Sequence, residues 1–239
     1  MDEFLQKWTS QASHYIGEHF DHCKPLLDRD FTGISPYVRF VSTQLYLSCH
    51  FSSESVLILT REKKEWDADL INRSIIEGLV KYIFMLQGSE EEMIAKAKEY
   101  WELLPDYSAI KRSDRAHSFL KHVDGYRTDK WRGIEEMTLN EQDVNKLRGS
   151  SNKRERKMLS QKWSFTEIVT KFGQSGDKDL ELLVHLAYGY GMSSHLVHKD
   201  GDGVAMIWDR DTRNHERKFA AKMGHSARII LDICRLTEM

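Results

Sequence analysis

Three side chains that often take part in catalysis recur at every fourth position of the segment 185–200, which reads HLAYGYGMSSHLVHKD. They are Tyr190, Ser194 and His198, so on a helix they would form a polar stripe among apolar residues. Tyrosine and serine hydroxyls can hydrogen-bond a substrate, and a histidine can transfer protons near neutral pH. This stripe is the first candidate site.

A second set of polar residues lies in the segment 69–87, which is apolar on almost every side between Ile75 and Leu86. Arg73, Glu77 and Lys81 are spaced four apart there. One interpretation is an ion-pair ladder at a half-exposed edge, worth a few tenths of a kcal/mol per pair. The other is an Arg–Glu pair that faces a cavity, because a buried charge is tolerated only when it is paired.

The two sets together could support metal-independent cleavage of RNA. A histidine can move the 2′-hydroxyl proton or protonate the leaving oxygen, and an arginine can stabilise the charge on phosphorus. Arg73 and His198 would fill these roles if their helices face each other, and Glu77 would orient Arg73. Tyr190 and Ser194 would donate hydrogen bonds. In the alternative reading, His198 only stabilises the end of its own helix, by about 0.3–1 kcal/mol.

Metal and nucleotide sites have weaker support, and we predict neither a metal nor a cofactor. No GxxxxGK[ST] or strand-linked GxGxxG motif occurs. The DGDG run at 200–203 resembles the start of a calcium loop, but Val204 replaces the third carboxylate. His195 and His198 could form only half of a metal site. A further set of aligned residues reads as a solvated polar face: His14, Glu18 and His22.

Composition favours an all-α protein of one domain. The chain has 239 residues, of which 40% are apolar and 30% charged, and only three are proline. The net charge of −2 provides no global basic field. The three cysteines form no CxxC pair, and no signal peptide or apolar run long enough for a membrane span is present. We therefore expect a cytoplasmic protein that does not bind membranes.

Periodicity and capping signals divide the chain into helices joined by short turns. We expect Pro105 to end one helix, Ser52 or Ser53 to cap another, and DGDG to form a flexible turn before a short strand or loop at 204–208. The expected helices cover residues 2–23, 36–49, 52–64, 69–87, 89–104, 109–123, 139–147, 164–172, 179–198 and 212–236.

The stretch 106–162 is charged and poor in apolar residues, so we read it as an insertion between N-terminal helices (1–105) and C-terminal helices (163–239) of a single domain. Residues 146–162 carry seven Lys or Arg and one acid. They could bind a phosphate backbone, although aromatic stacking residues are not interleaved; the alternative is a solvated linker or loop. The candidate nucleic-acid-binding residues are Lys153, Arg154, Arg156 and Lys157.

Two segments resemble a known group of proteins. The helix containing LINRSIIEGLVKYIFML and the later Tyr-x3-Ser-x3-His helix are similar to domain-of-unknown-function family 5677, an uncharacterised group of all-helical bacterial proteins. The resemblance matches Arg73 and Glu77 on the early helix and the Tyr, Ser and His on the late one. It covers about 38–104 and 163–236, and it leaves 106–162 unmatched.

The helical layout also resembles, more loosely, the HEPN group, which includes ribonuclease toxins and phage-defence effectors. The hallmark of that group is Arg, four to six residues, then His. Arg112 and His117, and Arg115 and His122, fit this spacing but lie in the charged middle of the chain. His198 has no Arg before it at that spacing, so a HEPN-type mechanism would need Arg73 from another helix.

We therefore expect a polar pocket with one of two uses. The first is HEPN-like, metal-independent ribonuclease activity in phage defence or a toxin system. The second is a non-catalytic sensor or interaction module that binds a small ligand or a partner protein. RNA and a second copy of the chain are the partners considered.

Overall fold

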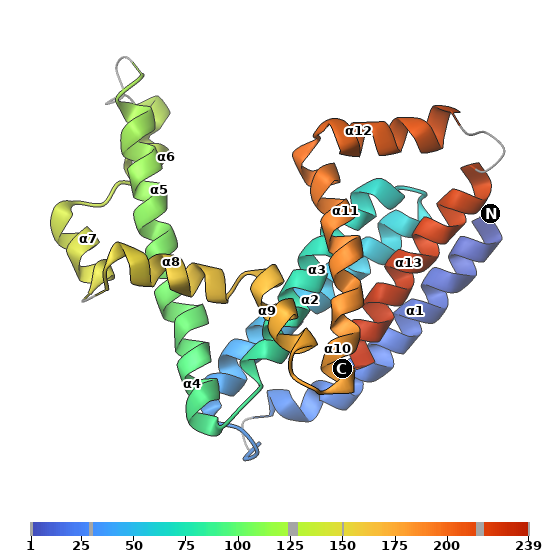
Figure 1. Cartoon of the computed structure of the whole chain (residues 1–239), viewed down its shortest axis with the longest axis horizontal. Coiled ribbons are helices and arrows are strands. Elements are labelled where there is room, and N and C mark those ends of the chain that lie inside the picture. Colours follow the sequence, from blue (N-terminus) through green and yellow to red (C-terminus); the bar gives the residue numbers. More distant parts are fainter. Residues whose placement is uncertain (1, 29–30, 124–128, 150, 214–217, 239) are drawn as a thin grey trace. The chain divides into compact units, whose positions relative to one another are not determined.

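Helix is the only regular structure in the described part of the chain, which comprises residues 2–28, 31–123, 129–149, 151–213 and 218–238 of a computed structural model (Figure 1). The expected all-α fold is thus confirmed. The chain forms two compact units, one made of residues 1–93 and 165–239 and the other of residues 94–164. Each is described separately.

The first unit is built around α3 (Glu65–Met85). This helix packs against α2 (Pro36–Arg61), α9 (Phe165–Gly173), α11 (Leu186–His198) and α13 (Lys218–Glu238) (Figure 1). A helix that is apolar on all sides must be surrounded by others to remove that surface from water. The buried apolar residues of α3 include Ile75, Ile76, Leu79, Val80, Ile83 and Phe84.

Shorter elements surround this core. α1 (Asp2–Cys23) packs on α2 and α13 and is followed by the 3₁₀ turn η1 (Lys24–Leu27). The helix α10 (Lys178–Leu182) and the 3₁₀ turn η4 (Leu183–His185) lead into α11. After α11, the helix α12 (Gly201–Trp208) and the π-helical segment η5 (Asp209–Arg213) precede α13.

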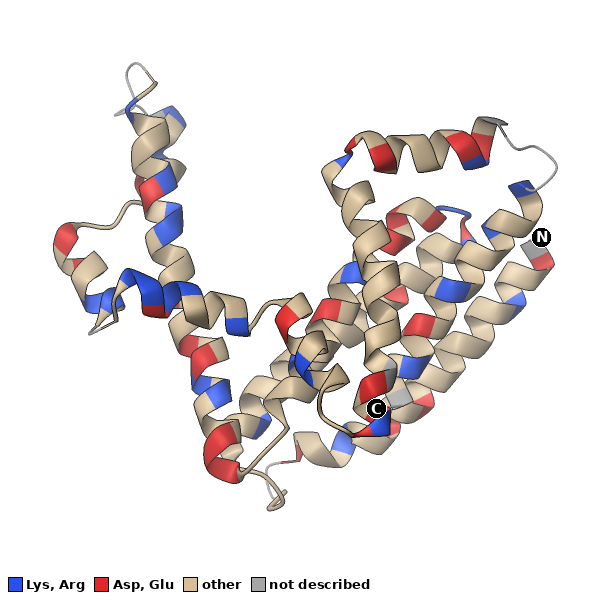
Figure 2. Ribbon diagram, in the orientation of Figure 1, with Lys and Arg blue, Asp and Glu red and all other residues tan. Residues whose placement is uncertain are grey.

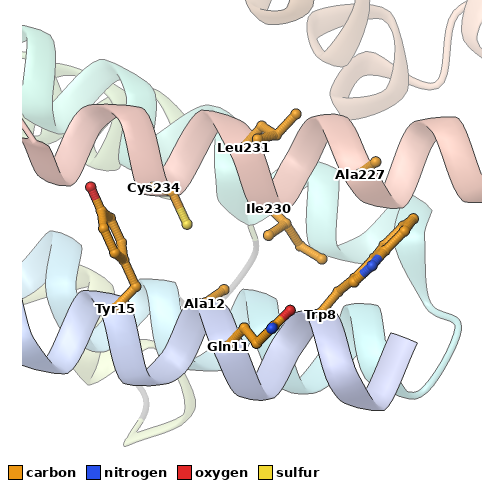
Figure 3. Close-up of a pocket in the computed structure, with 8 residues that line it drawn as sticks. All are labelled: Trp8, Gln11, Ala12, Tyr15, Ala227, Ile230, Leu231 and Cys234. Carbon is orange, nitrogen blue, oxygen red and sulfur yellow. The ribbon is translucent and has the colours of Figure 1, made fainter. Parts of the chain in front are cut away.

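An apolar groove of about 460 Å³ lies between α1 and α13 (Figure 3). Trp8 and Tyr15 extend from α1 toward α13, and Ala12 lies between them. Ala227, Ile230, Leu231 and Cys234 of α13 line this groove, yet Leu231 is 52% exposed. α13 therefore has two apolar sides, and its most deeply buried side carries Ile229, Ile233 and Leu236.

Two sequence predictions in this unit were wrong. α2 runs without a break, because Ser52 and Ser53 bond back to carbonyls four residues earlier (2.9 and 3.0 Å) and do not cap a new helix. The DGDG run begins α12, with Asp200 as its N-cap. Gly203 is buried there. This position needs a glycine because a Cβ atom would lie 2.4 Å from the carbonyl oxygen of His195.

The second unit is arranged around α5 (Leu104–Leu120), which contacts α6 (Arg132–Glu135), α7 (Glu141–Arg148) and α8 (Lys153–Lys162). It also contains η3 (Asp129–Trp131) and is entered through α4 (Glu90–Lys98) and the π-helical segment η2 (Glu99–Leu103). Trp163 is buried and donates to the Glu99 carboxylate (2.9 Å).

Three predictions in this unit also need correction. Pro105 does not stop the chain's helical path, because η2 is a wider π turn that accommodates a residue without an N–H. α7 begins at Glu141, later than the expected residue 139, because Asn140 is its N-cap. The stretch read as a linker contains α8, which begins with a capping box formed by Asn152 and Glu155.

Within the described residues, no helix combines the length and the apolar character that crossing a bilayer requires.

Candidate functional site

Arg73, Glu77 and Tyr190 meet where α3 packs on α11, together with Lys81; these four residues are called the Tyr190 cluster. Arg73 Nη2 donates to Tyr190 Oη (2.7 Å), and Tyr190 Oη donates to Glu77 Oε2 (2.8 Å). Lys81 Nζ donates to Glu77 Oε1 (2.5 Å). The Arg73 guanidinium also lies over the Tyr190 ring (4.1 Å), and Phe165 stacks against that ring with centroids 3.7 Å apart. The cluster joins α3 and α11 through half-buried groups.

The electrostatics of the Tyr190 cluster fix its protonation. Burial alone would raise the pKa of Glu77, but hydrogen bonds from Lys81 and Tyr190 and the charge of Arg73 outweigh burial and lower it. Burial and the Glu77 carboxylate raise the pKa of Tyr190 to about 12. At neutral pH the phenol is therefore neutral and the carboxylate is charged, so neither exchanges protons readily.

The structure does not bring Ser194 and His198 into the Tyr190 cluster. An α-helix turns about 100° per residue, so each step of four residues drifts by about 40° around the axis. Ser194 is half-buried and His198 is exposed. His198 also lies eight residues beyond Tyr190, about 12 Å along the helix axis. Arg73 and His198 thus occupy different places on the surface.

His198 instead shares the exposed end of α11 with His195. His195 Nδ1 lies 2.8 Å from Asp200 Oδ2, while Asp200 Oδ1 accepts a hydrogen bond from the Gly203 amide (3.0 Å) as the cap of α12. The hydrogen bond and charge of Asp200 raise the pKa of His195. Asp200 occupies Nδ1, so Nε2 is the ring nitrogen able to exchange a proton with a ligand. These residues, with Lys199, are called the α11 end.

Sequence reasoning missed a second polar network, which is more deeply buried. Arg210 of η5 donates to Glu65 (2.8 Å) and stacks over Trp66 (3.7 Å). His225 lies between Arg210 (Nδ1, 2.9 Å) and Asp69 (Nε2, 3.0 Å). Since arginine can only donate, Nδ1 accepts from Arg210 and Nε2–H donates to Asp69. Both ring nitrogens are used within the protein.

Arg228 extends this network along α3. It contacts Asp69 (2.7 Å) and Asp232 (2.9 Å), and Asn72 donates to Asp232 (3.3 Å). Burial raises the pKa of Asp232, whereas the hydrogen bonds from His225 and Arg228 outweigh burial at Asp69 and lower its pKa. Glu65, Asp69 and Asn72 follow one another at four and three residues, and that helical spacing of polar residues was the available signal.

Two glycines of α11 differ in their surroundings. A Cβ atom at Gly189 would lie 3.0 Å from Arg228 Nη1, so this glycine leaves room for the Arg228 side chain of α13. A Cβ atom at Gly191 would meet no atom within 4 Å. Gly191 is exposed, and packing within the described structure gives no reason for it.

Seven of the sixteen Lys and Arg residues of the second unit lie in 146–162, which covers α8 and the end of α7 (Figure 2). Lys153, Arg154 and Lys157 are exposed, whereas Arg156 is half-buried and donates to the Ser151 carbonyl (2.6 Å). This unit has 16 Lys and Arg against 11 Asp and Glu, a net charge of +5, whereas the remainder of the chain carries −7. The helix dipole makes positive side chains near a helix N-terminus destabilising, so these Lys and Arg residues are not there to stabilise α8.

In the described part of the chain, no three His, Cys, Asp or Glu side chains come together as potential metal ligands. The His195–His198 pair and the His14–Glu18 pair (3.2 Å) therefore gain no further ligand there.

Comparison with known proteins identifies one family. The sequence model of a family of unknown function (DUF5677) matches residues 39–215, more than half of the chain. The match includes residues 106–162, which the resemblance seen in the sequence did not cover. It ends at residue 215, whereas that resemblance continued to about residue 236. Neither a curated protein nor a solved structure gives a significant match.

Proposed function

We propose that this chain, which belongs to the DUF5677 family of unknown function, cleaves single RNA strands without a metal ion. The observation that carries the proposal is the imidazole pair at the α11 end. His195 is held by Asp200 at 2.8 Å, and His198 is exposed three residues later on the same helix. Side chains three apart on a helix are neighbours, so both rings can reach one phosphodiester.

The chemistry needs one base and one acid. His198, as a neutral imidazole, takes the proton of the ribose 2′-hydroxyl, and the 2′-oxygen attacks phosphorus. The bond from phosphorus to the 5′-oxygen breaks, and a 2′,3′-cyclic phosphate forms. His195, whose pKa is raised by Asp200, donates its Nε2 proton to the leaving 5′-oxygen. Lys199, at the same helix end, supplies a positive charge for the phosphoryl oxygens.

In this proposal the Tyr190 cluster is a positioning element. Its hydrogen bonds hold α11 against α3 and thereby fix the direction of the α11 end. Arg73 is committed to Tyr190, which lies about 12 Å from His198 along the α11 axis, so Arg73 does not serve the phosphate that His198 contacts.

The second unit supports RNA binding through charge. Lys153, Arg154 and Lys157 project from a helix whose N-terminus is itself electropositive. Contacts of this kind bind phosphates irrespective of base sequence, and they weaken steeply as salt rises. Cellular RNA is the expected target, in the cytoplasmic defence or toxin setting that the HEPN resemblance implies.

The test is an RNA cleavage assay with EDTA present, using wild type, His195→Ala and His198→Ala. General acid–base catalysis typically contributes 10²- to 10⁴-fold, so each substitution should lower the rate by about that factor. His14→Ala is the matched control, because His14 is an exposed histidine of α1 that is paired with the carboxylate of Glu18 on the same helix. It should cleave RNA at the wild-type rate.

All variants should melt at the wild-type temperature, since the substituted rings are exposed. No cleavage by wild type at high protein concentration would overturn the proposal and favour a non-catalytic module that binds a partner or ligand. Cleavage that persists in His198→Ala would place the chemistry elsewhere.

A further inference from the structure

The outward face of α11 carries a continuous row of residues that leads to the α11 end. Tyr188, Gly191, His195 and His198 follow one another at three, four and three residues, a spacing that places them on one side of a helix. We name these four residues the α11 strip. The Tyr190 cluster lies on a different side of the same helix, bonded to α3.

Tyr188 is the unusual member of the α11 strip. Its side chain is 77% exposed, more than any other large hydrophobic side chain described as exposed. An exposed aromatic ring offers a face on which an unpaired nucleic-acid base can stack. The tyrosine lies about 10 Å along the axis from His195, since seven residues of helix separate them.

Gly191 lies between that ring and the histidines. It weakens the helix by about 1 kcal/mol against alanine, and a Cβ atom there would meet nothing within 4 Å. Gly17 and Gly224 are equally open, so openness alone does not mark Gly191. Gly191 is distinguished by its position between Tyr188 and His195. With no side chain there, a ligand backbone can approach the helix closely.

We propose that the α11 strip is a binding track for single-stranded RNA, in which an unpaired base stacks on Tyr188 and the backbone crosses Gly191 to the two histidines. This inference rests on the proposed function and names its substrate as unpaired RNA. Base–aromatic stacking is tolerant of sequence but requires a base whose face is free, so a continuous duplex cannot use the track.

The experiment measures binding separately from cleavage. The probe is a short fluorescein-labelled single-stranded RNA with 2′-O-methyl riboses, which cannot form the cyclic phosphate, and binding is read by fluorescence anisotropy. Tyr188→Ala should weaken binding about 5- to 150-fold, the range expected for the loss of one stacked base. The same RNA annealed to its complement should bind more weakly than the single strand and should not respond to the substitution.

Gly191→Leu gives a second, independent reading. It should raise the melting temperature through better helix propensity and yet weaken RNA binding, because the new side chain covers the track. Matched controls exist for both substitutions. Phe51→Ala removes an aromatic that is 60% exposed on α2, and Gly224→Leu fills an equally open glycine on α13. Neither control should change RNA binding.

The outcomes separate the two proposals. If wild type binds the single strand through Tyr188 but cleaves no RNA, the track stands and the catalytic proposal fails. If wild type cleaves RNA but Tyr188→Ala and Gly191→Leu bind as wild type does, the catalytic proposal stands and the track is wrong. Equal binding of duplex and single strand would also overturn the track.

Discussion

The middle of α11 and its C-terminal end both carry polar residues, in opposite circumstances. In the middle, Tyr190 is half-buried, stacked on Phe165 and bonded to Arg73 and Glu77. At the C-terminal end His198 is exposed, and the partner of His195 is Asp200, the N-cap of α12, rather than a residue of α3.

The difference shows that polar residue types do not by themselves make a reactive site. In the Tyr190 cluster every strong interaction is with another protein group, and the phenol pKa of about 12 makes proton transfer unfavourable at neutral pH. At the α11 end one imidazole nitrogen is held while the other faces a potential substrate. Burial and hydrogen bonding commit the Tyr190 cluster to stability, and exposure leaves the α11 end available for chemistry.

Glu77→Gln should sharpen this comparison with the largest stability effect. Glutamine keeps the shape but removes the charge that holds Lys81 and Arg73, and both are only partly exposed. The free energy of unfolding should fall by about 1–3 kcal/mol, measured by urea denaturation. RNA cleavage per folded molecule should be unchanged.

The control for that substitution is Glu18→Gln on α1, where the side chain is 59% exposed and the change should stay within about 0.5 kcal/mol. Loss of cleavage without loss of stability in Glu77→Gln would break the comparison, because it would make the Tyr190 cluster the reactive end.

Gly203→Ala tests whether the α11 end depends on the close contact of α11 with α12. The new Cβ atom would lie 2.4 Å from the backbone oxygen of His195, and backbone cannot move aside as a side chain can. Unfolding free energy should fall by about 1–3 kcal/mol, and cleavage should fall with it because Asp200 is displaced. Gly224→Ala, which meets no atom, should instead stabilise by up to about 1 kcal/mol.

If Gly203→Ala folds as stably as wild type and cleaves RNA normally, the α11–α12 corner is not a fixed part of the site. Thermal melting together with the cleavage assay distinguishes these results.

Much of the fold was predictable because helix signals are local. The all-apolar segment around Ile75 and Phe84 marked α3 as central. The sequence also grouped Arg73, Glu77 and Tyr190 in one pocket, but it did not predict that they hydrogen-bond one another. The true position of His198 was not anticipated, because a spacing of four was treated as a straight stripe although it drifts around the helix.

Other features depended on information that local patterns do not hold. The close packing of α12 on α11, where a Cβ atom at Gly203 would lie 2.4 Å from the carbonyl oxygen of His195, is a contact between helices that no local pattern shows. The network of His225 and Arg210 joins residues far apart in the chain. By contrast, α8 could have been found, since Asn152 and Glu155 have the spacing of a capping box.

The smallest expected effect is a shift of the pH–rate profile of cleavage, produced by Asp200→Asn. Asparagine still caps α12 well, so the corner should stay folded. Asp200 raises the pKa of His195, and His195 must be protonated to act as the acid. Activity is therefore lost as pH rises through the pKa of His195. Without the carboxylate that pKa moves down toward its ordinary value, so the alkaline limb of the pH–rate profile should shift to lower pH. An unmoved alkaline limb would mean that another group donates the proton, and the α11 end would then resemble the Tyr190 cluster in having only a structural role.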